Sequence, residues 1–158
     1  MTSPHDVSYQ RLVEIRHHRA PENSKRVLVV EDNPDTRDGL GEALEDAGYE
    51  VVTVENGLKA LDHLRWSWRP GCVVLDMRMP VMTGWELRET MAGDPSLGTI
   101  PVIGMTGGRW KPEDAGRFFS VLAKPIVVKE LLAGLEAVWH FAGAAQTREG
   151  DTMRRPGS

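Results

Sequence analysis

The sequence contains a single cysteine, Cys72, among its 158 residues. One cysteine cannot form an intramolecular disulfide, so the chain lacks the disulfide framework typical of small secreted domains. Cys72 lies in a run of apolar residues, where the simplest role for it is that of a small core side chain. The cysteine content is therefore typical of a protein in the reducing cytoplasm.

Long apolar segments are also missing. No stretch of about 18 consecutive apolar residues occurs, which argues against a membrane-spanning helix. Residues 1–20 lack the apolar core of a secretory signal peptide. We therefore expect a cytoplasmic protein with no membrane partner.

Positive charge is scarce in the central part of the chain. Residues 26–142 hold 12 Lys and Arg against 18 Asp and Glu, a net charge of −6. An acidic domain is poorly suited to an extended contact with a phosphate backbone, so we expect no direct nucleic-acid partner.

Composition divides the chain into three parts. Residues 1–25 show little periodicity and predict a flexible N-terminal extension. Residues 26–142 contain regular apolar patterns and predict one domain. Residues 143–158 are Gly-containing, polar and charged, which predicts a disordered C-terminal tail.

Strand and helix patterns alternate five times within the central part, which predicts an α/β fold with a parallel sheet. The predicted strands are 26–30, 50–54, 72–75, 101–105 and 120–123. They are mostly unbroken Val, Ile and Leu runs, as expected for strands covered on both faces. Asn33 as N-cap, Pro34 in the first turn and Gly48 past the end define the first helix of this domain.

Polar residues follow four of these strands. Glu31 and Asp32 follow the first and Asp76 the third; Thr106 and Lys124 follow the fourth and fifth. Ligands in such sheets bind beyond the carboxyl ends of the strands.

No Lys or Arg is adjacent in sequence to the acidic residues, so a divalent metal is their readiest partner. Mg²⁺ would be held directly by Asp32 and Asp76 and through water by Glu31. A metal beside a free carboxylate oxygen suits covalent attack on phosphorus. Thr106 and Lys124 would then bind the added phosphoryl oxygens.

The chain resembles the receiver domain of two-component response regulators over about residues 26–142. The resemblance rests on VLVVEDN (27–33), LDMRMP (75–80) with Gly84, MTG (105–107) and LAKP (122–125), in this order and spacing. It implies a doubly wound, five-stranded parallel sheet of order 2-1-3-4-5, the flavodoxin-like (CheY-like) fold.

The same resemblance implies a role for each matching position. Asp76 would be the phosphoacceptor, and Glu31 and Asp32 the metal-binding acidic pair. Arg78 would supply a backbone carbonyl to Mg²⁺. Thr106 would be the switch hydroxyl and Lys124 the phosphate-sensing lysine, with a cis bond to Pro125.

The implied function is that of a single-domain response regulator. A sensor histidine kinase or phosphotransfer protein would phosphorylate Asp76, which would switch binding to an unknown downstream protein; a homodimer is left open. The 19 residues after Trp139 are too few for an output domain. We expect no enzymatic activity beyond self-phosphorylation and slow self-dephosphorylation, because Arg78 stands where aspartyl-phosphate phosphohydrolases carry a second Asp. The alternative is a receiver-fold interaction module that works without phosphorylation.

The chain departs from the family between the fourth and fifth strands. Val121 occupies the usual position of an aromatic residue, and the interval from Thr106 to Lys124 is about one helical turn short. Pro112 and Gly116 lower helix propensity in this interval. We therefore expect a shortened or irregular fourth helix and a loop-like switch over 106–120. Phe119, which strand alternation would place on the same side as Val121, or Trp110 would take the place of the missing aromatic residue.

Overall fold

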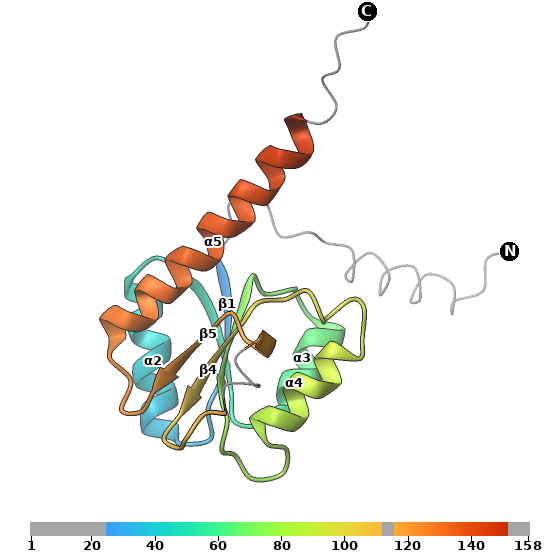
Figure 1. Ribbon diagram of the computed structural model, residues 1–158. Helices are drawn as coiled ribbons and strands as arrows, with labels where there is room; N and C mark the ends of the chain where they lie inside the picture. Colours follow the sequence, from blue (N-terminus) through green and yellow to red (C-terminus); the bar gives the residue numbers. More distant parts are fainter. Residues whose placement is uncertain (1–24, 112–115, 152–158) are drawn as a thin grey trace, which may run out of the picture.

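The computed structural model describes residues 25–111 and 116–151, which form a parallel sheet covered on both faces by helices (Figure 1). The sheet has five strands in the order β2-β1-β3-β4-β5, as the resemblance to receiver domains implies. The strands are Arg26–Val30 (β1), Glu50–Val54 (β2), Cys72–Asp76 (β3), Val102–Thr106 (β4) and Ser120–Ala123 (β5). The helices are Pro34–Asp46 (α2), Gly57–Trp66 (α3), Gly84–Ala92 (α4) and Val128–Asp151 (α5).

Two apolar layers hold the helices to the sheet. Side chains alternate along β1, so Val27 and Val29 face the layer under α2 and α5, while Leu28 and Val30 face the layer under α3 and α4. All residues of β3 and β4 are buried, which explains why these strands read as continuous apolar runs. Among the described residues, no helix is long and apolar enough to cross a membrane.

Helix α2 begins and ends where its capping residues predict. The side chain of Asn33 accepts a hydrogen bond from the backbone N–H of Thr36 at 2.9 Å, and Pro34 opens the first turn. Gly48 has φ 94°, the left-handed conformation that glycine adopts without steric cost. These caps fix the point at which the chain leaves β1, and so the position of Asp32.

Helix α5 is longer than the sequence predicts. It continues to Asp151, so residues 143–151 are helical where a disordered tail was expected. Ala144, Ala145 and Gln146 favour helix and extend the last turns of an already nucleated helix at little cost. Residues 152–158, and the N-terminal extension apart from Lys25, lie outside the described residues.

The segment between β4 and β5 contains no α-helix in its described residues, 107–111 and 116–119. Within residues 116–119, Gly116 and Arg117 have 3₁₀ geometry and lie shortly before β5. Pro112 lies outside the described residues. A shortened or irregular fourth helix is predicted for the segment that follows β4, and this prediction is confirmed. The helix labelled α4 is a different element.

Three aromatic rings pack in this region. Trp85, Trp110 and Phe118 are mutually edge-to-face, with ring centroids 5.0–5.6 Å apart. A side chain on Gly104 would lie 3.3 Å from both Trp110 and Phe118, so this glycine lets the two rings sit against β4. We call these three rings the aromatic cluster.

The expectation for Phe119 is wrong in its geometry. Phe119 precedes β5 and its ring lies 5.8 Å from that of Phe141 on α5, whereas Val121 packs against the layer under α3 and α4. The two residues therefore do not share a face, because the alternation of a strand does not extend to a residue before its first position. Phe118, which the sequence analysis did not single out, is the buried ring on the Val121 side.

We expect Phe118→Ala to lower the free energy of unfolding by about 3 kcal/mol, because it removes a buried ring from the aromatic cluster. Phe119→Ala, the matched control at the neighbouring position, should cost less than about 1 kcal/mol because Phe119 is 37% exposed. Urea denaturation of both variants measures the difference. Equal losses would show that the aromatic cluster does not stabilise the fold.

Candidate functional site

Three carboxylates meet at the carboxyl edge of the sheet. Glu31 and Asp32 follow β1, Asp76 ends β3, and these strands are hydrogen-bonded neighbours with Val30 opposite Leu75. One ligand oxygen from each carboxylate lies within 4.8 Å of the others. Glu31 is 1% exposed and Asp76 2% exposed, whereas Asp32 is open to solvent. The parallel register brings these residues together.

Lys124 lies against this cluster. Its Nζ is 3.0 Å from Glu31 Oε2 and 3.2 Å from Asp76 Oδ1. Burial lowers the pKa of Lys124, but its hydrogen bond to Glu31 and the charges of Glu31 and Asp76 outweigh this effect, so the pKa is raised overall. No Lys or Arg is adjacent to these acidic residues in the sequence, but the fold brings Lys124 into contact with two of the carboxylates.

Asp76 has one satisfied and one unsatisfied oxygen. Its Oδ1 accepts a hydrogen bond from the Arg78 N–H at 3.2 Å and pairs with Lys124. Its Oδ2 is buried and has no hydrogen-bond partner among the described residues. Burial, reinforced by the charge of Glu31, raises the pKa of Asp76 to about 6, against the lowering effects of the Arg78 N–H and Lys124. A buried, unsatisfied carboxylate oxygen beside two further carboxylates fits a cation or an electrophile.

The backbone around the acidic cluster is tightly constrained. Arg37 donates from Nη1 to the carbonyl oxygens of Glu31 at 3.1 Å and Asp32 at 3.4 Å. A side chain on Gly84 would lie 2.5 Å from the carbonyl oxygen of Asp76, so only glycine allows α4 to start this close to β3. Arg37 is a further residue of the site that the sequence did not predict, and its only sequence signal is a position within reach of the preceding strand end.

Thr106 and Arg78 complete the rim of the site. Thr106 ends β4, and its Oγ1 accepts a hydrogen bond from the Gly108 N–H at 3.0 Å. A side chain on Gly108 would meet Arg78 Nη2 at 2.9 Å and Thr106 Oγ1 at 3.6 Å. The exposed Arg78 side chain therefore lies over Gly108, next to the Thr106 hydroxyl.

The residues expected to report on the site lie farther along the same side of the sheet. Trp110 and Val121 both pack against the layer under α3 and α4, and Trp110 belongs to the aromatic cluster. The Nε1 of Trp110 is buried without a hydrogen-bond partner in the described structure. Phe119 is not part of this group, because its ring contacts α5.

The fold and the acidic cluster define a known class of protein. Residues 27–135 match the family model of the response regulator receiver domain, and the chain belongs to this family. It is a receiver-domain response regulator of the two-component type.

Named relatives agree with this assignment. The chain is 31% identical over 117 residues to the polar-differentiation response regulator DivK of Brucella anthropi, covering 72% of this chain and 94% of that protein. The structure of chemotaxis protein CheY4 of Vibrio cholerae is 30% identical, with a TM-score of 0.66, covering 73% of this chain and 98% of that one.

A second similar structure holds a metal. The receiver domain of sensor histidine kinase PA1611 from Pseudomonas aeruginosa PAO1 is 24% identical, with a TM-score of 0.66 over 74% of this chain and 98% of that one. It is described with a magnesium ion coordinated in its active site cleft. At this identity the comparison shows a shared fold.

The raised pKa of Asp76 predicts a pH-dependent effect of Asp76→Asn on stability. The folded pKa of about 6 exceeds the ordinary value of 3.8, so ionised Asp76 destabilises the fold above about pH 6, and this penalty disappears as pH falls toward 4. In EDTA at pH 8, Asp76→Asn should therefore be more stable than the wild type by on the order of 2 kcal/mol.

Urea denaturation between pH 4 and 8 measures this difference, with Asp62→Asn on the exposed face of α3 as the matched control. The advantage of Asp76→Asn should shrink as pH falls, while the control stays close to wild type. A pH-independent difference would contradict the raised pKa.

Proposed function

We propose that Asp76 accepts a phosphoryl group and that this modification switches binding to a downstream protein. The observation that carries the proposal is the buried Asp76 Oδ2, which lacks a hydrogen-bond partner in the described structure and lies among three carboxylates. A donor with reactive phosphorus would satisfy this oxygen by bonding to it. Membership of the receiver family supports the same role.

Asp32 and Asp76 are the residues we propose to hold Mg²⁺ directly, with Glu31 acting through water and Arg78 through its backbone carbonyl. The donor set is all oxygen, which suits a hard cation that retains several waters. The ion, when bound, supplies positive charge to the oxygens of the transferred group. The magnesium in the PA1611 receiver structure supports this assignment.

In the proposed transfer, Asp76 Oδ2 forms a bond to phosphorus as the P–N bond of a phosphohistidine donor breaks. The donor imidazole recovers the electron pair of that bond. Lys124, already 3.2 Å from Asp76 Oδ1, is placed to donate to a phosphoryl oxygen. Thr106 would exchange its contact with the Gly108 N–H for donation to another phosphoryl oxygen, which would change the segment leading to Trp110.

The phosphoryl donor would be a sensor histidine kinase or a phosphotransfer protein, as in two-component signalling, and the site of action the cytoplasm. The chain would act as a phosphoacceptor and not as an enzyme with a separate substrate. Its own chemistry would be limited to accepting the group and losing it slowly to water.

Incubation with acetyl phosphate and Mg²⁺ should add one phosphoryl group to the wild-type protein, read by intact mass. Asp76→Asn should abolish the addition because it removes the nucleophile, while the control Asp62→Asn should be labelled like the wild type. Labelling of Asp76→Asn at the wild-type level would overturn the assignment. A wild type that stays unmodified would instead favour an interaction module that works without phosphorylation.

Magnesium should raise the melting temperature of the wild type by about 3–6 °C at saturation, because it binds the folded carboxylate cluster and relieves its repulsion. Asp32→Ala should lose most of this rise, since it removes a direct ligand. Asp62→Ala should keep it. Equal stabilisation of Asp32→Ala and the wild type would place the magnesium site elsewhere.

A further inference from the structure

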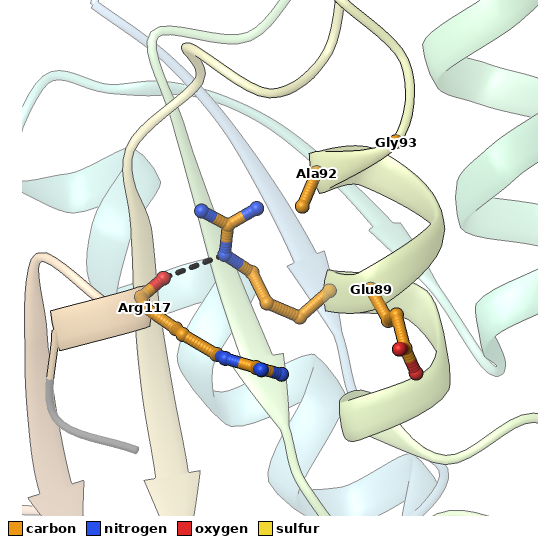
Figure 2. Close-up of a pocket in the computed structure, with 5 residues that line it drawn as sticks. Glu89, Ala92, Gly93 and Arg117 are labelled. Atoms are coloured by element: carbon orange, nitrogen blue, oxygen red, sulfur yellow. Dashed lines mark hydrogen bonds between the residues drawn. The ribbon is translucent and has the colours of Figure 1, made fainter. Parts of the chain in front are cut away.

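A second concave site lies away from the acidic cluster. It is a cavity of about 410 Å³ between the later turns of α4 and the turn that leads into β5 (Figure 2). Its lining consists of Arg88, Glu89, Ala92, Gly93 and Arg117. Helix α4 begins at Gly84, beside Asp76 at the carboxyl edge of the sheet. The cavity lies near the other end of α4 and therefore toward the opposite edge of the sheet.

Arg88 enters the cavity with an unsatisfied donor. Its Nε donates to the carbonyl oxygen of Arg117 at 2.6 Å, the bond drawn as a dashed line in Figure 2. Its Nη1 is buried and has no acceptor in the described part of the chain. A buried N–H group of a charged side chain is unfavourable without a partner, so Arg88 is held at the wall of the cavity at a cost in free energy.

The cavity carries unbalanced positive charge. Neither Arg88 nor Arg117 forms an ion pair with a described carboxylate. Glu89 also lines the cavity, but Figure 2 shows its carboxylate beside α4 with no hydrogen bond to Arg117. Burial lowers the pKa of Arg88, and the charge of Arg117 lowers it further. An anion between the two guanidinium groups would relieve this repulsion.

We propose that this cavity binds a small anionic molecule through Arg88 and Arg117, with a carboxylate or phosphate group accepting hydrogen bonds from the guanidinium groups that line it. A guanidinium group presents its donors in the planar arrangement that such groups accept. The volume of about 410 Å³ lies within the range of small-molecule sites and exceeds a single phosphate ion. Ala92 and Gly93 form the uncharged wall against which the rest of the molecule packs.

Binding at this cavity has a structural consequence for the segment before β5. Arg117 directly precedes Phe118, and the Phe118 ring contacts Trp85 and Trp110 in the aromatic cluster. An anion that binds both Arg88 and Arg117 would therefore hold Phe118 in place against α4. Tryptophan fluorescence is therefore a readout of binding that does not depend on phosphorylation.

The test is a titration of the full chain with inorganic phosphate and, separately, with citrate, in EDTA and at an ionic strength held constant with sodium chloride. We expect saturable binding by calorimetry, a change in tryptophan fluorescence, and a melting temperature raised by about 2–4 °C at saturation. Binding of phosphate alone assigns a phosphate-type ligand, and binding of citrate alone assigns a carboxylate. EDTA keeps the acidic cluster free of metal, so the negative charge of its carboxylates repels anions from that site.

Arg117→Gln and Arg88→Gln should each weaken binding at least about tenfold, because each removes charge-assisted hydrogen bonds. Arg117 is exposed, so its variant is expected to fold normally even if Arg88→Gln does not. Lys129→Gln, which removes one exposed positive charge from α5, is the matched control and should bind like the wild type. Unchanged affinity in Arg117→Gln, equal loss in Lys129→Gln, or no binding of either anion would overturn the proposal.

Discussion

The structure depends on keeping two buried carboxylates, Glu31 and Asp76, side by side at the ends of neighbouring strands. Removing carboxylates from water is costly, and their like charges oppose each other. Lys124 offsets part of this cost from the end of β5. The remaining imbalance appears as the raised pKa and the unsatisfied oxygen of Asp76. A site left unbalanced in this way suits the cation and the phosphoryl donor that we propose for it.

The parallel sheet makes this arrangement possible because all its strands end at one edge. Glu31, Asp76 and Lys124 come from three different strand ends, yet they need no long loop to meet. The surrounding backbone is held by Arg37 and by the close approach of Gly84. The chemical site is therefore rigidly supported on the α2 and α4 sides.

The region between β4 and β5 is built differently from the chemical site. Its described residues contain no α-helix, and the aromatic cluster covers β4 at Gly104, where an added Cβ would lie 3.3 Å from two of the rings. Sequence patterns predicted the loss of helix, because Pro112, Gly116 and the short interval are local features. They did not predict that Phe118 packs inward and Phe119 outward, because residues before the first position of β5 do not follow the alternation of the strand. Helix α5 was likewise underestimated, since a polar composition does not exclude helix when a long helix precedes it.

The strand and helix pattern, the caps of α2, and the identity of the residues at each strand end can all be read from the sequence. These are local properties, set by apolar periodicity and by the conformational preferences of single residues. Three further features follow from the folded arrangement alone: Lys124 pairs with Glu31 and Asp76, Asp76 Oδ2 has no partner among the described residues, and Arg88 and Arg117 share a cavity. Each of these depends on distances between segments remote in sequence, which strand register and helix packing set and no local pattern encodes.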